Sequence, residues 1–351
     1  MRCAPMIANG AWCGNDGQLW LVLSCWASFH QKEEECMPIT LNHIAQQGER
    51  GAAMMPIIQG VGRAAIEIAA LLRGAVFRGA LGAAGAENVQ GEQQQKLDIL
   101  SDEIFLDEMR ATGHVCAVGS EEQEELLVIS EYSHADYLVL VDPLDGSSNL
   151  DVDGPVGTIF SIVKRTSAKD TTPVAADTLQ SGRDVIAAGY VLYGPSTMLV
   201  CSVGSGVNGY SYNPSSARFE LSHADMQIPA TGGYYSVNEA NADKWLDNMG
   251  DRLQALKQES GLGMRYVGAM VADMHRTLLK GGIFLYPADE KNTNGKLRLL
   301  YEAIPMGFLM EQAGGKAMSK DIAVLDVQPE ALHQRVPVYL GANAAVDKLL
   351  G

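Results

Sequence analysis

The sequence predicts an α/β protein made of two domains, or of one large α/β unit. Its 351 residues exceed the usual length of a single domain. Amphipathic helical patterns alternate with short apolar runs of the kind found in strands, and this alternation starts again after residues 228–233, IPATGG. We therefore expect an N-terminal domain at residues 39–228 and a C-terminal domain at residues 229–351.

Residues 1–38 predict a weakly ordered N-terminal extension. They show no clear periodicity, hold four of the six cysteines and close on the acidic run EEE at residues 33–35. The apolar stretch at residues 19–29 is too short to span a bilayer, and Asp16 makes a poor flank for a signal peptide. No C-x-x-C pair is present, so neither a zinc site nor a redox motif is indicated, and we expect a reduced, cytoplasmic chain.

Helical patterns dominate the next part of the chain. We expect a short helix at residues 40–47 and a longer one at residues 54–73, where apolar side chains recur every three or four positions. The glycine-rich residues 74–91 suggest a flexible linker or a mobile active-site loop. A further helix at residues 96–109 carries Asp98 near its start.

Strand patterns follow, and they supply most of a first sheet. The expected strands are residues 115–118, 126–130, 137–141, 156–163, 185–192 and 198–203, with a hairpin at 209–221. A polar loop without cysteine is expected at residues 166–183.

The C-terminal part repeats the alternation of helices and strands. We expect strands at residues 234–237, 282–286 and 336–341, helices at 244–259, 271–280 and 297–312, and a loop or strand end at 265–268. Glu302 lies on the last of these helices.

The stretch DPLDGSSN, residues 142–149, is the best candidate for a functional site. It follows the apolar run YLVLV, which predicts a strand buried on both faces and ending at Val141. Asp142 and Asp145 offer hard oxygen ligands to a divalent cation. The glycine and serines that follow allow backbone N–H groups to approach an anion. The alternative is an ordinary turn, in which the same residue types are common.

Two overlapping motifs are rejected. NLDVDG, residues 149–154, fits the start of a calcium-binding EF-hand loop, but position 12 would be Phe160, which cannot bind a cation. The same aspartates are not the nucleophile of a haloacid-dehalogenase-type phosphatase, because SSN precedes them where an apolar strand is required.

The net charge of −16 argues against nucleic acid or an anionic membrane surface as the main partner. An anionic substrate remains possible, because the global field is largely screened beyond about 8 Å at physiological salt. A few local basic side chains and a metal ion then decide binding.

Several long runs, taken in order, resemble class I fructose-1,6-bisphosphatases over residues 39–351. The runs are KLDILS (96–101), GSEE (119–122), DPLDGSSNLD (142–151), AAGYVLYGPSTMLV (187–200), YSVNE (235–239), RYVGAMVADMHRT (265–277), GGIFLYP (281–287) and GKLRLLYEA (295–303). The resemblance implies a two-domain, layered α-β-α-β-α sandwich of the sugar phosphatase type, assembled as a homotetramer. It also implies Mg²⁺-dependent hydrolysis of the 1-phosphate of fructose 1,6-bisphosphate, in gluconeogenesis.

The resemblance assigns roles by position. Metal ligands would be Glu121, Asp142, the carbonyl of Leu144, Asp145 and Glu302, and Asp98 and Glu122 would hold and deprotonate the attacking water. The 1-phosphate would be held by Gly146, Ser147, Ser148 and Arg298. The 6-phosphate and sugar would contact Asn238, Tyr266, Met270, Tyr286, Lys296 and an Arg265 reaching from a neighbouring subunit. No organic cofactor is implied.

The chemistry of these residues fits the assignment. Four carboxylates suffice for two or three Mg²⁺ ions, or Mn²⁺ or Zn²⁺, and a pair of ions roughly 3.5–4 Å apart suits phosphate-ester hydrolysis. The planar guanidinium of Arg298 complements phosphate oxygens. Taken singly, three of the assigned residues also have a structural interpretation. Asp98 could be a helix cap, Glu302 a solvent-facing helix residue and Arg265 an ion-pair partner.

The sequence departs from the family where many members bind AMP. Residues 48–56, GERGAAMMP, lack the expected phosphate-binding turn, Asp136 replaces a lysine and Lys164 replaces an arginine, although Tyr137 is kept. We expect weak control by AMP, and no thioredoxin switch. Asn241 and Glu92 also differ from the family pattern but keep polarity or charge, so we expect activity to survive.

Two other functions are considered. One is a bisphosphatase that prefers sedoheptulose 1,7-bisphosphate or another sugar bisphosphate. The other is a non-catalytic regulatory or scaffold protein, which the complete set of carboxylates disfavours.

Overall fold

The computed structural model describes residues 38–78, 83–87 and 93–351. The predicted extension at residues 1–38 therefore lies outside the described residues except for Pro38, and so does Glu92. Residues Ile39–Gly351 form one compact unit that contains two large sheets. The last strand of the first sheet ends at His223 and the second sheet begins at Tyr234, so the domain boundary near residue 228 falls between them and stays a prediction.

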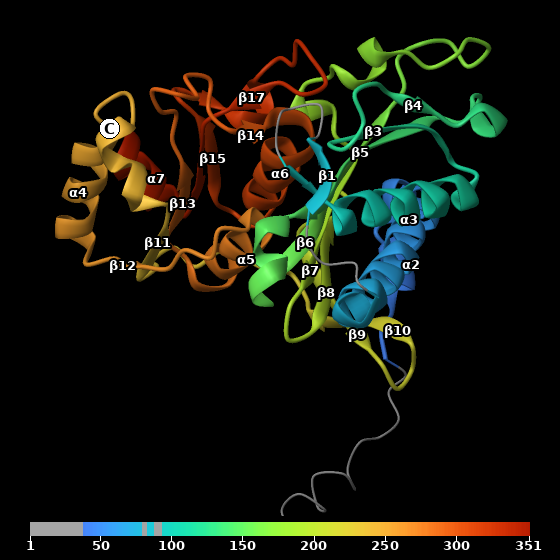
Figure 1. The fold of residues 1–351 in the computed structure, drawn as a ribbon, viewed down its shortest axis with the longest axis horizontal. Helices are drawn as coiled ribbons and strands as arrows, with labels where there is room; N and C mark the ends of the chain where they lie inside the picture. The colour runs from blue at the N-terminus through green and yellow to red at the C-terminus, as the bar shows by residue number, and fades with distance from the viewer. Residues whose placement is uncertain (1–37, 79–82, 88–92) are drawn as a thin grey trace, which may run out of the picture. The chain divides into compact units, whose positions relative to one another are not determined.

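Helices and sheets alternate in five layers (Figure 1). From one side to the other these are α2 with α3, an eight-stranded sheet, α5 with α6, a six-stranded sheet, and α4 with α7. This is the α-β-α-β-α arrangement that the family resemblance implies. Its three hydrophobic cores fill the spaces between the layers.

The eight-stranded sheet has the order β10-β9-β8-β7-β6-β5-β3-β4. All neighbours are antiparallel except β3 and β5, which are parallel, so the carboxyl ends of β3 and β5 meet at one edge of the sheet. The strands are β3 (Val115–Ser120), β4 (Leu127–Val128), β5 (Tyr137–Asp145), β6 (Val156–Lys164), β7 (Ala187–Tyr193), β8 (Thr197–Ser202), β9 (Asn208–Asn213) and β10 (Arg218–His223).

The two N-terminal helices cover one face of this sheet. They are α2 (Gly48–Arg78) and α3 (Lys96–Thr112), preceded by a 3₁₀ turn at Leu41–Gln46. The predicted apolar stripe of α2 is buried: Ile57, Ile58 and Ile68 are fully enclosed against α3 and the sheet. Burying such a side chain contributes roughly 1.5–3 kcal/mol.

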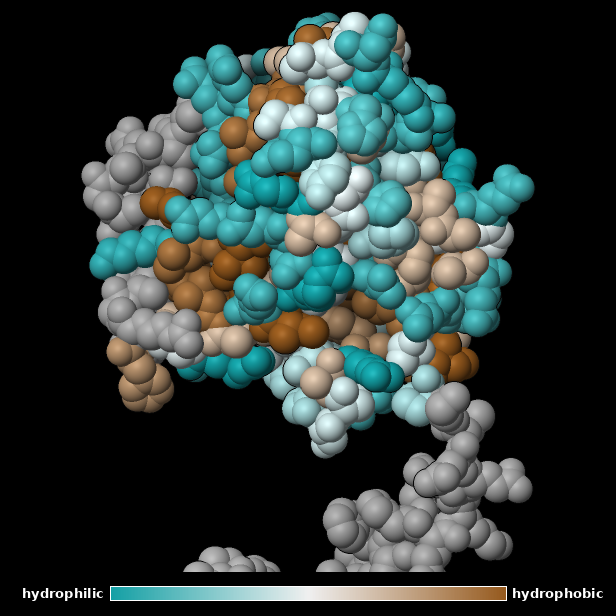
Figure 2. All heavy atoms as spheres, turned by 90° about the vertical axis from the view of Figure 1, so that its right-hand side faces the viewer, coloured by the Kyte–Doolittle hydropathy of each residue, from teal (hydrophilic) through white to brown (hydrophobic). Residues whose placement is uncertain are grey.

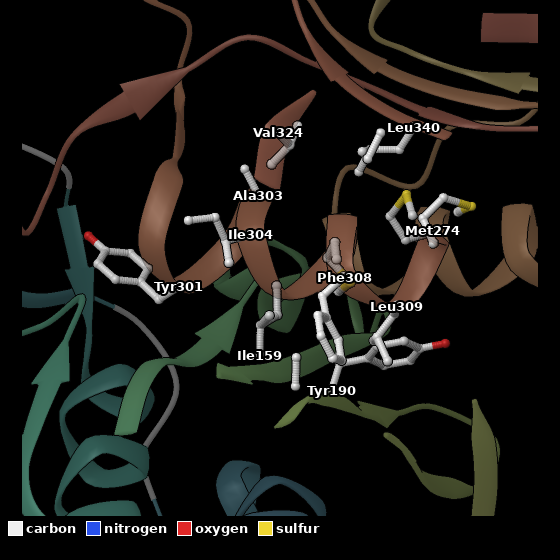
Figure 3. Packing of buried hydrophobic residues seen from close by; sticks show 14 of the residues in the cluster. Ile159, Tyr190, Met274, Tyr301, Ala303, Ile304, Phe308, Leu309, Val324 and Leu340 are labelled. Carbon is white, nitrogen blue, oxygen red and sulfur yellow. The ribbon is translucent and has the colours of Figure 1, made fainter. Parts of the chain in front are cut away.

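A second pair of helices lies between the two sheets. It consists of α5 (Met270–Lys280) and α6 (Ile304–Gln312). Figure 3 shows Ile304, Phe308 and Leu309 of α6 packed between Ile159 and Tyr190 of the first sheet and Leu340 of the second. Because α6 contacts a sheet on either side, nearly all its residues are buried, and its sequence shows no polar face.

The six-stranded sheet has the order β12-β11-β13-β18-β15-β16, with α4 (Met249–Ser260) and α7 (Asn343–Leu350) on its outer face. Its strands are β11 (Tyr234–Ser236), β12 (Gly263–Met264), β13 (Ile283–Tyr286), β15 (Lys316–Ser319), β16 (Ile322–Ala323) and β18 (Val338–Gly341). Two short pairs complete the structure: β1 (Ala83–Glu87) with β2 (Gln93–Gln95), and β14 (Leu297–Arg298) with β17 (Arg335–Val336).

Several sequence-based boundaries were wrong. The α2 helix begins at Gly48 and runs to Arg78, and β1 lies at Ala83–Glu87, so part of the expected linker at residues 74–91 has regular structure; the rest lies outside the described residues. The helix expected at residues 244–259 begins only at Met249, and its expected first residue, Lys244, instead ends the 3₁₀ turn Glu239–Lys244. The strands β15 and β16 and the helix α7 were not predicted.

The α2 helix also meets a length and hydropathy test for a membrane span over Gly48–Ala75, but most of that window is buried inside the fold. This is the pattern of a core helix. Figure 2 looks onto the side that carries α2 and α3 in Figure 1, and apolar side chains show there among hydrophilic ones. At the end of α2, Phe77 is 92% exposed.

Candidate active site

A pocket of about 440 Å³ opens where the carboxyl ends of β3 and β5 meet. Both sheets contribute to its walls. It is lined by Asp98, Glu121, Glu122, Asp142, Leu144, Asp145, Gly146, Ser147, Ser148, Asn149, Asn238, Tyr266, Gly268, Met270, Asp273, Phe284, Tyr286, Lys296, Leu297, Arg298 and Glu302.

The DPLD segment is a bulged end of β5, not the turn after it. The strand was expected to stop at Val141, but it continues to Asp145. Asp142 pairs with Ile159 and Asp145 with Gly157, so two residues of β5 stand opposite Thr158 alone. The Thr158 hydroxyl donates to the Pro143 carbonyl at 2.8 Å and lies 2.9 Å from the Tyr193 hydroxyl. The bulge re-aims both aspartates towards the pocket.

Gly146 makes the turn that follows. Its φ of 79° lies in the left-handed region, and a Cβ atom here would come within 2.3 Å of the Ala269 Cβ. Only glycine satisfies both conditions. A 3₁₀ turn, Ser147–Val152, begins immediately afterwards and brings the Ser147 and Ser148 backbone to the pocket wall.

Three buried carboxylates converge at the base of the pocket. One oxygen from each of Asp142, Asp145 and Glu302 lies within 4.8 Å of the others. Glu121, also buried, completes the set of four. The Asp142 carboxylate accepts from the Leu144 N–H at 3.0 Å, and Asp145 accepts from the Val271 N–H at 2.7 Å.

Burial and mutual repulsion disturb the protonation of this group. Desolvation, followed by the charges of Glu121, Asp145 and Glu302, raises the pKa of Asp142 well above its usual value. Desolvation likewise raises the pKa of Asp145 to about 7, against the lowering effect of backbone N–H donors from Val271 and Met270. It raises the pKa of Glu302 to about 8, against the lowering effect of Arg298.

Glu302 lies on a π-helical turn, not on the regular helix expected at residues 297–312. That segment divides into β14, the π-helical turn Leu299–Ala303, and α6. The wider turn lets Glu302 point back towards Arg298, whose N–H donates to the Glu302 carboxylate at 2.5 Å. Glu302 is therefore buried, and its interpretation as a solvent-facing residue was wrong. Single π-helical turns often lie at functional sites.

The Arg298 side chain connects two of the four carboxylates. Its Nη2 lies 2.5 Å from Glu121 Oε1, and its Nη1 lies 3.8 Å from Glu302 Oε2. It therefore forms salt bridges with both Glu121 and Glu302.

Asp98 and Glu122 reach the same pocket from separate elements. Asp98 lies in the first turn of α3 and is buried, while Glu122 follows β3. Both residues thus line the same pocket as the four carboxylates.

The C-terminal part of the chain forms a second wall of the pocket. Asn238, Tyr266, Met270, Tyr286 and Lys296 all line it. They come from the ends of β11 and β13, the loop between β12 and α5, the start of α5 and the segment that leads into β14.

Arg265 does not line the pocket. Its guanidinium lies 5.1 Å from the centre of the Tyr234 ring and donates to the Met264 carbonyl at 2.6 Å. A role in a neighbouring subunit's site stays a prediction.

Sequence reasoning missed Asp273. This buried carboxylate on α5 accepts from the N–H groups of Val267 and Gly268 at 3.0 Å each, and so holds the loop that carries Tyr266. Its place within the run RYVGAMVADMHRT marks it only in retrospect. Asn149, Gly268, Phe284 and Leu297 also line the pocket and were not predicted.

The donor set fits hard divalent cations. The converging charged donors are all carboxylates, they are buried, and burial and mutual repulsion raise the pKa values of Asp142, Asp145 and Glu302. A divalent cation would offset that repulsion. Oxygen-rich sites of this kind suit Mg²⁺ or Mn²⁺.

Comparison with known proteins points to one family. The chain matches the family models "Fructose-1-6-bisphosphatase, N-terminal domain" over residues 38–224 and "Fructose-1-6-bisphosphatase, C-terminal domain" over residues 228–350. It is 47% identical over 308 residues to the fructose-1,6-bisphosphatase class 1 of Persephonella marina, covering 88% of this chain and 93% of the relative. The enzyme of the same name from a Sulfurihydrogenibium species is 49% identical over 283 residues, covering 80% and 86%.

Solved structures point to the same family. The holo form of Leishmania major fructose-1,6-bisphosphatase superposes with a TM-score of 0.85 at 37% identity, covering 90% of this chain and 98% of that one. The apo form of the same enzyme gives a TM-score of 0.79 at 36% identity with the same coverage.

Proposed function

Because the chain belongs to the fructose-1,6-bisphosphatase family of phosphatase hydrolases, we propose how its pocket hydrolyses fructose 1,6-bisphosphate. The products are fructose 6-phosphate and inorganic phosphate. The observation that carries the proposal is the juxtaposition, in one pocket, of a buried carboxylate group, Arg298 and the Gly146 turn. The carboxylates alone would repel a phosphate ester. Binding therefore requires that Arg298 and bound metal ions outweigh their negative charge.

Arg298 and the Gly146–Ser148 backbone hold the 1-phosphate. The guanidinium offers a planar pair of donors that matches two phosphoryl oxygens, and the N–H groups after Gly146 offer more. Arg298 contacts Glu121 in this structure, so substrate binding draws it from a carboxylate to a phosphate. The arriving phosphate thereby leaves Glu121 available for a metal ion.

Asp98 and Glu122 orient the attacking water and accept its proton. The water oxygen forms a bond to phosphorus while the bond between phosphorus and the C1 oxygen breaks, and the C1 oxygen takes a proton from solvent to leave as the sugar hydroxyl. General-base catalysis of this kind contributes about 10²–10⁴-fold. Burial on the rigid helix α3 fixes the position of Asp98 for this step.

Glu121, Asp142, Asp145, Glu302 and the Leu144 carbonyl would hold two or three Mg²⁺ ions, with Mn²⁺ or Zn²⁺ as substitutes. When bound, such ions neutralise the charge that develops on the phosphoryl and leaving oxygens. The protein contributes the fixed spacing of the ligands, which the β5 bulge and the π-helical turn define.

The second sheet, α5 and the loops beside them supply the other wall of the substrate site. Tyr266, Tyr286 and Asn238 offer neutral donors, and Lys296 offers a charge, for the 6-phosphate, while Met270 packs against the sugar. We also propose that Arg265 completes a neighbouring subunit's site in a homotetramer. We place the enzyme in the cytoplasm.

A phosphate-release assay tests the function. We expect turnover of fructose 1,6-bisphosphate that EDTA abolishes and Mg²⁺ restores. Hydrolysis at full rate without metal would overturn the metal assignment, and absence of turnover with every divalent ion would favour a non-catalytic role. Sedoheptulose 1,7-bisphosphate, assayed in parallel, decides the substrate: a higher kcat/KM for it would replace the fructose assignment.

A further inference from the structure

A hydrogen-bonded cluster of two buried residues and one half-buried residue lies next to the pocket and is not explained by the roles given above. It consists of Asp102 on α3 together with Ser120 and Gln123, on either side of Glu121 and Glu122. Asp102 is 2% exposed and Ser120 is fully buried.

Both oxygens of the Asp102 carboxylate are occupied. The Ser120 hydroxyl donates to Oδ1 at 2.6 Å, and Gln123 Nε2 donates to Oδ2 at 2.6 Å. Ser120 in turn accepts from the Glu122 N–H at 3.3 Å. One carboxylate therefore holds the residue before, and the residue after, the Glu121–Glu122 pair.

The same carboxylate is fixed to the element that carries Asp98. Asp98 and Asp102 are four residues apart on α3, and both are buried, so they share one face of the helix at about 6 Å along its axis. On its other side, Glu121 donates its N–H to the Val141 carbonyl of β5 at 3.0 Å. The turn with Glu121 and Glu122 is thus held between α3 and β5.

We propose that Asp102 is a positioning residue that sets the distance of Asp98 from Glu121 and Glu122 through Ser120 and Gln123. The inference rests on the proposed roles of Asp98, Glu121 and Glu122. A displacement of about 1 Å in a catalytic group can cost about 10²-fold in rate. Side chains that orient metal ligands typically change activity or metal affinity by about 10–100-fold when they are replaced.

Burial of this carboxylate favours a functional explanation over a purely structural one. Desolvation raises the pKa of Asp102, so the charged form is costly there, and donors from Ser120 and Gln123 offset only part of that cost. An apolar side chain of the same size would fill the space between α3 and β3 without this cost.

The test exchanges the hydrogen-bond donor and acceptor between positions 102 and 123. Asp102→Asn leaves one oxygen acceptor where the carboxylate has two, so either Ser120 or Gln123 loses its acceptor. Gln123→Glu turns a second carboxylate towards Asp102. Each single variant should lower kcat by about 10–100-fold. The KM for fructose 1,6-bisphosphate should stay within about twofold, because neither residue lines the pocket.

The double variant carries both substitutions, and we expect it to regain most of the lost kcat. The new amide at position 102 then donates to the new carboxylate at position 123, so the contact is restored with its direction reversed and the net charge unchanged. We expect its kcat to return to within about threefold of the wild type, because double-variant recovery is the mark of a direct pairwise interaction.

Metal binding provides a second readout that does not depend on turnover. Calorimetric titration of the substrate-free protein with Mn²⁺ should show weaker binding in each single variant and recovery in the double variant. The matched control is Asp107→Asn on the same helix, where the side chain is 78% exposed; it should change neither kcat nor Mn²⁺ affinity.

Three outcomes would overturn the proposal. Single variants that match the wild type in kcat and Mn²⁺ affinity would do so, as would a double variant whose defect equals the product of the single defects. If Asp102→Asn does not fold, as judged by its thermal transition, Ser120→Ala and Gln123→Ala carry the test, and normal kcat in both would count against it. Failure of the proposed function is distinguishable, because the wild type itself would then release no phosphate.

Discussion

Arg298 and Glu121 form a buried ion pair of 2.5 Å that joins the strand before the π-helical turn to the end of β3. Both side chains are at most one-tenth exposed. The pair brings together a proposed phosphate-binding cation and a proposed metal ligand. Substrate and metal therefore compete with the pair, and each helps the other to bind by separating it.

Replacement of Arg298 should change both kcat/KM for the substrate and its dependence on Mg²⁺ concentration. We expect Arg298→Ala to lower kcat/KM by about 10²–10³, the usual loss when one group that stabilises a developing anion is removed. Arg298→Lys should recover only part of this, because a lysine keeps the charge without the planar fork. Steady-state kinetics at several Mg²⁺ concentrations measure both effects.

Arg183→Lys is the control for that experiment. Arg183 pairs with Glu311 and Asp326 away from the pocket, so its replacement should leave kcat/KM unchanged. Equal kcat/KM in Arg298→Lys and the wild type would show that the guanidinium fork is not used.

Asp98→Asn should lower kcat by about 10²–10⁴, because the amide cannot accept a proton from water. The fold should survive, since the substitution is nearly isosteric, and circular dichroism and the melting temperature check this. A variant with near-normal turnover would leave Asp98 as no more than a helix-cap residue.

Stability of the metal-free protein should fall as the pH rises from about 6.5 to 8.5. Folding raises the pKa of Asp145 to about 7 and that of Glu302 to about 8, while the unfolded values lie near 4. In this window the folded state therefore binds more protons than the unfolded state, and stability is lost as those protons leave. We expect the melting temperature in EDTA to drop by several degrees across it.

The pH window is chosen to exclude His275. Burial lowers the pKa of His275 to about 4. Its contribution to stability is therefore lost as the pH falls below about 6.5, whereas that of the two carboxylates is lost as the pH rises. Asp145→Asn should flatten the slope in EDTA, and saturating Mg²⁺ should remove it, because the bound ions keep the carboxylates charged. A melting temperature that rises with pH in EDTA would contradict the assignment.

AMP should inhibit weakly. Residues 48–56, where many family members have a phosphate-binding turn, form the first part of α2 here, and Asp136 is engaged with Lys169 at 2.7 Å. Tyr137 and Lys164 remain as cross-strand neighbours on β5 and β6. The loss of two charge-assisted hydrogen bonds, about 1.5–3 kcal/mol each, would raise the dissociation constant for AMP from the micromolar towards the millimolar range.

An AMP titration at saturating Mg²⁺ and low substrate measures this. Asp136→Lys should strengthen inhibition if Tyr137 and Lys164 still form part of a site. Half-inhibition of the wild type in the low micromolar range would show that other residues have rebuilt it.

The order and type of most elements could be predicted from the amino-acid sequence. The apolar run of β5 is buried on both faces, as its composition indicates for a central strand, and the apolar stripe on α2 faces a core. The sequence also marked Gly146 as a place where backbone N–H groups can approach an anion, whereas its left-handed turn and its close approach to Ala269 are seen only in the structure. The long motifs around these positions also indicated the family.

The ends of those elements, and the contacts of their side chains, depend on the folded arrangement of distant segments. The bulge at Asp142–Asp145 depends on Thr158 and Tyr193 of neighbouring strands, and the π-helical turn depends on the return of Glu302 to Arg298. The bonds from Ser120 and Gln123 to Asp102 likewise join the end of β3 to α3. Most of these contacts join residues far apart in the chain, so no local pattern of hydrophobicity or propensity records them.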